Sequence, residues 1–297
     1  GPIRNTIFRM WTGSQGTLGV LTKMVVQIEP LHRNRKIYFI PFQNLSDAVE
    51  PLKQIQRREI GTECFILNSL NLASFLNDSW QIPAAFPAAA ADTAEFEALR
   101  KTLPRWTLII CINGHLRRSD EKIAYETEAL KEVCEQMHVS LLESLPNVPG
   151  AENRLSEQML RPWGGLKKFN YKGAVHDLTF KAPLNRLSAI KDIFEQTALN
   201  HGHSIDDIGY YILPVERGRA LHCEFDLHGT PGSGKTEALW LNVSADLMNA
   251  GAYFDRPYGQ WAQMVYERAA GYTAMLRKLK AEMDPNNILN PGKLCFS

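Results

Sequence analysis

Three titratable side chains alternate along one short apolar stretch of the sequence. His222, Glu224 and Asp226 stand at every second position between residues 221 and 227. Because side chains alternate across a strand, all three are expected on one face, where they could accept and return a proton during a reaction. A solvated sheet face explains the same pattern, since charged side chains are mostly exposed. We take the three as candidate catalytic residues.

A glycine-rich turn near the start of the chain is a second candidate site. Gly13, Gly16 and Gly19 recur at every third position and precede residues 20–28, which are predicted to form a strand. Glycines let the backbone approach a ligand closely and present N–H groups to a phosphate or to the edge of a cofactor ring. A tight turn with no ligand explains the same residues.

Residues 229–236 read Gly-Thr-Pro-Gly-Ser-Gly-Lys-Thr and fit the phosphate-binding loop pattern in full. They stand between a predicted strand and a predicted helix, which is the context this loop requires. In a nucleotide site Lys235 would reach the β- and γ-phosphates and Thr236 would bind Mg²⁺. The remaining sequence shows no later strand ending in the Asp that would complete the metal site. We therefore favour a connecting loop and keep nucleotide binding as the alternative.

The elements that would position these residues form an α+β pattern. Apolar runs predict strands over residues 36–42, 64–67, 107–112, 175–180, 210–213 and 221–227. Helical periodicity predicts helices over residues 45–60, 119–137, 185–200, 236–249 and 260–283. Several strands are short and polar on one side, which favours a mixed or antiparallel sheet with helices on one face.

Composition excludes several classes of protein. The 297 residues include 33 Lys and Arg against 32 Asp and Glu, so there is no basic surplus of the kind that nucleic-acid binders carry. No apolar run approaches the roughly 20 residues that span a bilayer. The five cysteines form no CxxC pair, which disfavours a disulfide framework or a zinc site and favours a reducing, cytoplasmic location. No metal is expected.

The two ends of the chain resemble the FAD-linked oxidases of the vanillyl-alcohol oxidase and 4-cresol dehydrogenase superfamily. Residues 13–23 resemble the flavin-contacting loop and strand near the end of the family's FAD domain, and residues 284–293 resemble its terminal signature. The resemblance implies FAD as cofactor and a cap domain over residues 32–251, flanked by parts of the FAD-binding domain at residues 1–31 and 252–297. The implied FAD-binding residues are Gly13, Ser14, Gly16, Thr17, Gly19, Asn290 and Lys293.

The resemblance also assigns roles to residues between the two ends. His222 and Asp226 match in spacing a His and an Asp that line the substrate pocket of 4-cresol dehydrogenase-like enzymes. Arg256 fits the Arg of a Tyr-Arg pair that stabilises negative charge, although Asp255 stands where the Tyr would be. Tyr171 and His176 lie where relatives carry a residue covalently attached to FAD.

The implied function is a flavin-dependent oxidoreductase that transfers a hydride from a small-molecule substrate to FAD. The substrate would be a 4-alkylphenol or a 2-hydroxy acid. A Gly-Glu-His-Gly stretch typical of the hydroxy-acid group is absent, which favours the phenols.

The family's pyrophosphate-binding loop has no counterpart in the sequence, so we expect it on a missing N-terminal segment or a second chain. A redox partner protein and a homo-oligomer are further expectations. The alternative from another class is a nucleotide-binding or non-catalytic partner subunit built around residues 229–236.

Overall fold

The computed structural model describes residues 10–28, 31–32, 34–86 and 89–296. They divide into two compact units. Unit 1 combines the described parts of residues 1–29 and 254–297, and unit 2 comprises those of residues 30–253.

Unit 2 is built on a sheet with the strand order β1-β3-β2-β5-β6-β4, in which each neighbouring pair is antiparallel. The strands are β1 (Arg35–Phe42), β2 (Glu63–Asn68), β3 (Trp106–Asn113), β4 (Ala174–Pro183), β5 (Ile208–Val215) and β6 (Ala220–Gly229). Each contains one of the predicted strands and extends beyond it, because strand pairing continues into the flanking residues. The predicted fold class, an antiparallel sheet with helices, is confirmed.

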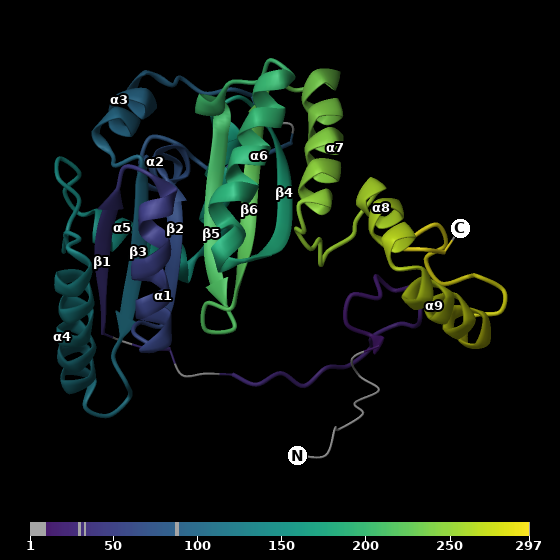
Figure 1. Ribbon diagram of the computed structural model, residues 1–297, viewed down its shortest axis with the longest axis horizontal. Coiled ribbons are helices and arrows are strands. Elements are labelled where there is room, and N and C mark those ends of the chain that lie inside the picture. The colour runs from purple at the N-terminus through teal and green to yellow at the C-terminus, as the bar shows by residue number, and fades with distance from the viewer. Residues whose placement is uncertain (1–9, 29–30, 33, 87–88, 297) are drawn as a thin grey trace. The chain divides into compact units, whose positions relative to one another are not determined.

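Helices cover both faces of this sheet, whereas one covered face was predicted (Figure 1). One face carries α1 (Val49–Arg57), α4 (Ser119–Met137), α6 (Leu187–Asn200) and α7 (Gly234–Asn249). The other carries α2 (Ser69–Leu76), α3 (Ala94–Thr102), α5 (Ala151–Leu160) and the 3₁₀ helix η3 (Pro162–Asn170). Short 3₁₀ turns complete the unit: η2 (Leu45–Ala48), η4 (Leu184–Arg186) and η5 (Ile205–Asp207).

An aromatic core on the second face anchors the short helices to the sheet. Trp80 stacks on Phe96 with ring centroids 4.3 Å apart, and Phe96 in turn contacts Tyr171 at 5.2 Å. Phe39 and Phe65, from β1 and β2, belong to the same buried cluster. Such rings bury large apolar areas, which stabilises the packing of the short helices on this face.

Unit 1 contains α8 (Gln260–Arg268) and α9 (Ala270–Met283), so the single predicted helix over residues 260–283 is broken at Ala269. The Tyr266 carbonyl there accepts hydrogen bonds from the Ala269 N–H and the Thr273 hydroxyl. The broken pair packs around Leu18, Tyr266, Leu276 and Phe296.

Residues 20–28 show no regular secondary structure, so the predicted strand is not formed. No described residue pairs with this segment, and a strand without a ladder partner leaves its backbone groups unsatisfied. Its apolar side chains are exposed, Val25 by 92%.

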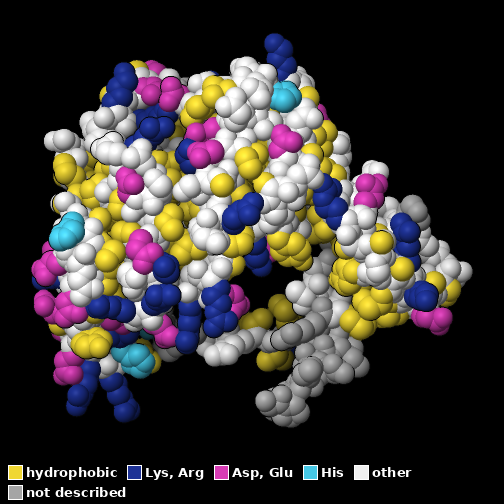
Figure 2. Space-filling model, viewed as in Figure 1, with side chains coloured by type: hydrophobic (Ala, Val, Ile, Leu, Met, Phe, Trp, Pro, Cys, Tyr) yellow, Lys and Arg dark blue, Asp and Glu magenta, His cyan; other side chains and the backbone are white. Residues whose placement is uncertain are grey.

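The surface of unit 2 carries charges of both signs. On the face shown in Figure 2, Lys and Arg side chains are interspersed with Asp and Glu side chains, as the near-zero net charge predicts. Among the residues described, no helix is long and apolar enough to cross a membrane.

Candidate functional site

A cavity of about 600 Å³ opens on the second face of the sheet in unit 2. Its floor comes from strands β2, β4, β5 and β6, and its walls come from α2, α5 and η3. The volume is typical of a small-molecule site. The apolar lining residues are Phe65, Phe75, Leu155, Met159, Pro162, Trp163, Leu166, Phe169 and Tyr211.

The cavity floor holds three carboxylates around one ammonium group. Lys168 Nζ, reaching down from η3, donates hydrogen bonds to Asp177 at 2.9 Å, Glu224 at 2.6 Å and Asp226 at 2.8 Å. The sheet register causes this clustering, because Asp177 pairs directly with Asp226 and the side chain of Glu224 shares their face. The carboxylate oxygens lie within 4.8 Å of one another, as metal ligands would, but Lys168 already supplies a cation among them.

This cluster shifts the acidities of its members in opposite directions. Burial disfavours the charged form of Lys168, but the charges of Asp226, Asp177 and Glu224 outweigh it and raise the pKa of the ammonium. Burial also disfavours the Asp226 carboxylate, but the charge of Lys168 and the hydrogen bonds from Asp177 and Lys168 together lower the pKa of that group. Burial and the neighbouring Asp226 charge raise the pKa of Asp177. Asp177 is therefore the carboxyl group that retains a proton most readily.

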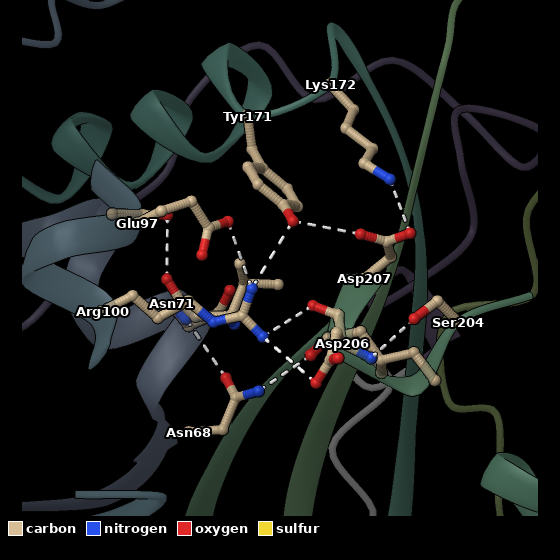
Figure 3. A network of polar contacts seen from close by, with 12 residues as sticks. Asn68, Asn71, Glu97, Arg100, Tyr171, Lys172, Ser204, Asp206 and Asp207 are labelled. Carbon is tan, nitrogen blue, oxygen red and sulfur yellow. Dashed lines mark hydrogen bonds and ion pairs between the residues drawn. The ribbon is translucent and has the colours of Figure 1, made fainter. Parts of the chain in front are cut away.

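Two asparagines on the first turn of α2 fix the inner edge of the floor. Asn71 Nδ2 donates to Asp226 Oδ2 at 2.9 Å. Asn68 Oδ1 accepts the N–H groups of Asn71 and Tyr210, both at 3.1 Å, and so caps α2 while tying it to β5 (Figure 3). Gly209 is required beneath them, because a Cβ there would lie 2.3 Å from Asn71 Oδ1.

The predicted catalytic residues are only partly brought together. Glu224 and Asp226 line the cavity. His222 lies on the same face of β6, opposite Lys181 and Leu213, but it is not among the cavity-lining residues. Arg256 belongs to unit 1. The roles proposed for His222 and Arg256 stay predictions.

The two candidates for covalent attachment of FAD lie away from the cavity lining. Tyr171 is buried, and its hydroxyl donates to Asp207 at 3.1 Å and lies 3.5 Å from an Arg100 nitrogen (Figure 3). Burial and the Asp207 charge raise the pKa of Tyr171, which makes it a poor nucleophile. His176 precedes Asp177 on β4 and so points to the opposite face of the sheet.

Several site residues carried little signal in the sequence. Lys168 follows Lys167 and looks like an ordinary surface lysine. Asp177 falls in a predicted strand, but the residues two positions before and after it, Val175 and Thr179, are not titratable. The signal that could have found Asp177 is the antiparallel pairing of two predicted strands.

In unit 1 the two end motifs meet. Asn290 Nδ2 donates to the Gln15 carbonyl at 2.5 Å, directly beside Gly16. Gly13 and Gly16 have φ values of 78° and 74°, which residues with a Cβ rarely adopt. Of the other predicted FAD-binding residues, Thr17 is buried with its hydroxyl on the Ser14 carbonyl at 2.6 Å, and Lys293 is exposed.

A buried lysine joins these motifs. Lys280 Nζ, on α9, donates to the Thr17 carbonyl at 2.8 Å and to the Leu289 carbonyl at 2.7 Å. It also pairs with Asp284. Asp284 Oδ1 and Oδ2 accept the N–H groups of Ile288 and Leu289. Lys280 thus connects the glycine-rich turn to the C-terminal turn.

The C-terminal segment matches a known family. Residues 258–294 match the model described as "FAD linked oxidases, C-terminal domain". Over this segment the chain is similar to the FAD linked oxidases. The resemblance drawn from the end motifs is thereby confirmed, and FAD is the cofactor of this family.

Individual proteins extend the similarity over nearly the whole chain. The glycolate oxidase subunit GlcD of Bacillus subtilis (strain 168) is 21% identical over 302 residues, covering 96% of this chain and 56% of that protein. Among solved structures, p-cresol methylhydroxylase with substrate bound has a TM-score of 0.73 at 15% identity, covering 100% of this chain and 58% of that one. The 4-ethylphenol oxidase from Gulosibacter chungangensis has a TM-score of 0.61 at 16% identity, covering 91% and 55%. The chain thus spans little more than half the length of these proteins.

The residues of unit 1 fit one edge of an FAD molecule. The left-handed turns at Gly13 and Gly16 leave their Cα positions free of close neighbours, since a Cβ at Gly13 would meet no atom within 4 Å. Asn287 Oδ1, in the C-terminal turn, is buried without a hydrogen-bond partner among the described residues. The backbone of the turns could donate hydrogen bonds to the polar edge of the flavin ring, and Asn287 Oδ1 could accept one from it.

The phosphate-binding-loop pattern lies in a different structural setting from the one it requires. Its preceding strand, β6, is antiparallel to both neighbours, whereas a phosphate-binding loop follows a strand of a parallel sheet. Thr236 is buried, and a Cβ at Gly229 would lie 2.7 Å from its hydroxyl oxygen. No comparison supports the nucleotide-binding alternative, and the segment connects β6 to α7.

Proposed function

We propose that this chain is the substrate-binding and flavin-contacting part of a flavin-dependent oxidoreductase. The match of residues 258–294 to the FAD linked oxidases carries the proposal. Unit 2 binds a small-molecule substrate in its cavity, and unit 1 holds FAD through Gly13, Gly16, Asn290 and Lys293. FAD, when bound, accepts a hydride from the substrate.

The charge of the cavity bears on which substrate is oxidised. A 2-hydroxy acid is an anion at neutral pH, and it would face Asp177, Glu224 and Asp226 with Lys168 already engaged. Like charges in a site shielded from water repel strongly. The aromatic walls suit a ring. A 4-alkylphenol-like substrate is therefore the first candidate, and a 2-hydroxy acid the second.

The proton released during oxidation requires an acceptor in the cavity. Glu224 is the best placed, because its side chain is 29% exposed and Lys168 holds it at 2.6 Å. Asp226 is fully buried and positions Lys168. His222 remains a second candidate on the same strand, and Arg256 is proposed to stabilise negative charge.

Anaerobic flavin reduction by 4-ethylphenol and by glycolate tests this proposal in the FAD-loaded protein, formed by this chain together with the segment or second chain that completes the FAD site. We expect reduction by 4-ethylphenol, slowed about 10²–10⁴-fold by Glu224→Gln or His222→Ala, whichever removes the proton acceptor. Glu143→Gln, a change at a carboxylate that is 63% exposed, is the control. If neither substrate reduces the flavin, the proposal is contradicted. A wild-type rate of flavin reduction in His222→Ala would show that His222 lies on a solvated face of the sheet and has no catalytic role.

The cofactor site of this chain is proposed to be partial. The pyrophosphate-binding loop has no counterpart in the 297 residues, and we propose that a further segment or a second chain supplies it. A redox partner and a homo-oligomer belong to the same proposal. Fluorescence titration of the isolated chain with FAD should show weak binding or none, and submicromolar binding would contradict it.

A further inference from the structure

The charged groups of the cavity floor leave a ligand with acceptors rather than donors. An ammonium group has three N–H bonds, and Lys168 directs them to Asp177, Glu224 and Asp226. The second oxygen of Glu224 remains as an acceptor, and the Glu224 side chain is 29% exposed.

The floor also carries an excess of negative charge. Three carboxylates face one ammonium group, and the excess persists if Asp177 retains its proton, because Glu224 and Asp226 still outnumber Lys168. Unbalanced charge in a cavity is costly, and a ligand of opposite charge would relieve it.

Asn71 provides an observation independent of the acidic cluster. Its side chain lines the cavity and is 4% exposed, and its Oδ1 has no hydrogen-bond partner among the described residues. An orphaned buried acceptor is uncommon in native structures. It adds another acceptor beside the carboxylates.

The walls suit the apolar body of the same ligand. Phe75, Trp163 and Phe169 line the cavity above the floor, and Trp163 remains 55% exposed. Aromatic faces attract cations as well as apolar groups. Floor and walls together therefore match a ligand with a cationic head and an aromatic body.

We propose that the cavity recognises an arylalkylammonium ligand, a primary ammonium group on an aromatic body, and rejects the corresponding carboxylate. The proposal rests on the proposed function, and it adds an ammonium group to the aromatic ligand that the cavity takes. It concerns recognition alone and leaves the bond that is oxidised unchanged.

Equilibrium binding of three probes with one skeleton tests the proposal. The probes are 2-phenylethylammonium, 2-phenylethanol and phenylacetate, and ligand-observed NMR on the 297-residue chain at pH 7 without FAD gives their Kd values. We expect the ammonium to bind at least tenfold more tightly than the alcohol, and the carboxylate more weakly than both. Equal or tighter binding of either the alcohol or the carboxylate would overturn the proposal.

Variants test whether the carboxylates of the cavity floor cause the preference for the ammonium probe. Glu224→Gln should weaken ammonium binding about tenfold and leave alcohol binding within twofold, and Glu143→Gln should change neither. An ammonium preference that survives Glu224→Gln would place recognition elsewhere and overturn the proposal, as would displacement of the ammonium by micromolar Ca²⁺ alone.

Failure of this proposal is distinguishable from failure of the proposed function. Ammonium binding without flavin reduction in the FAD-loaded protein would contradict the function alone. Flavin reduction by 4-ethylphenol in that protein, together with binding that does not favour the ammonium probe over the alcohol and the carboxylate, would contradict the recognition proposal alone.

Discussion

Each of the two units contains a nearly buried lysine that holds its parts together, and the two lysines differ in what surrounds them. Lys168 in unit 2 is 12% exposed and faces three carboxylates. Lys280 in unit 1 is 7% exposed and faces one carboxylate, Asp284, and two backbone carbonyls. The first arrangement has an excess of negative charge beside a cavity, whereas the second is balanced and lies among chain turns.

This difference separates a group that prepares a site for a ligand from one that only ties the chain together. A balanced pair satisfies every partner without a ligand. An unbalanced cluster costs folding free energy unless something else uses its charge. Substitutions at Lys168 and Lys280 should therefore have different consequences for the stability of the two units.

Replacing Lys168 by Met should strongly destabilise unit 2. Removing one partner from a buried ion pair leaves uncompensated charge and costs about 3–5 kcal/mol of unfolding free energy. Without Lys168 the folded-state carboxyl pKa values should rise above their unfolded value near 4, so stability is retained below about pH 4 and lost as pH rises. Denaturant unfolding between pH 4 and 8 measures this.

Lys167→Met is the matched control on the same helix, since among the described residues Lys167 Nζ donates to the Asn77 carbonyl and to no carboxylate. Equal losses in the two variants would show that the cluster has no special role.

Replacing Lys280 by Met should loosen unit 1 and leave unit 2 unaffected. Hydrogen–deuterium exchange should increase in residues 13–19 and 287–293, because Thr17 and Leu289 lose their common donor. The hydrogen bond from Lys280 lowers the pKa of Asp284 to about 2, so the stability this group contributes is present above about pH 4 and lost as pH falls towards 2. Exposed Lys278 on the same helix is the control, and equal exchange in Lys278→Met would refute the role.

Replacing Asp177 by Asn should flatten the pH dependence of stability. The raised pKa of Asp177 means that its contribution is present below the unfolded value near 4 and lost as pH rises through the folded value. One proton is worth at most about 1.4 kcal/mol per pH unit, and solvent screening reduces this for a side chain that is 39% exposed. Thermal unfolding from pH 5 to 9 should show a smaller slope, and an unchanged slope would exclude Asp177 as the titrating group.

Replacing Lys235 by Ala should have the smallest effect. Lys235 is exposed at the start of α7, and surface changes usually fall within about 0.5 kcal/mol. Denaturant unfolding and ATP titration should both be nearly unchanged. ATP binding that disappears in this variant would restore the nucleotide-binding alternative.

The strands could be predicted because their apolar alternation is local. Residues 221–227 and 175–180 predicted β6 and β4, and the one-face arrangement of His222, Glu224 and Asp226 follows from the same alternation. The long helices α4 and α6 were equally visible, since each has one apolar stripe against the sheet.

The helices that build the cavity were missed. Residues 69–76 are a short segment of five apolar and three polar residues that follows β2 directly, so their pattern does not separate helix from strand. Residues 162–170 contain Gly164-Gly165, and glycine has a low helix propensity, so the 3₁₀ helix that carries Lys168 was not predicted. Tertiary packing overrode weak local preference in both segments.

The sequence by itself determined the strands of a mixed or antiparallel sheet, the polar face of β6 and the two end motifs that resemble the FAD-linked oxidases, because each depends on residues close together in the chain. Only the tertiary structure decided that Asp177 pairs with Asp226, that Lys168 reaches both from η3, and that Lys280 joins Thr17 to Leu289. Those contacts span many residues, and their existence depends on strand order and on which face each short helix covers. Local periodicity carries no information about either.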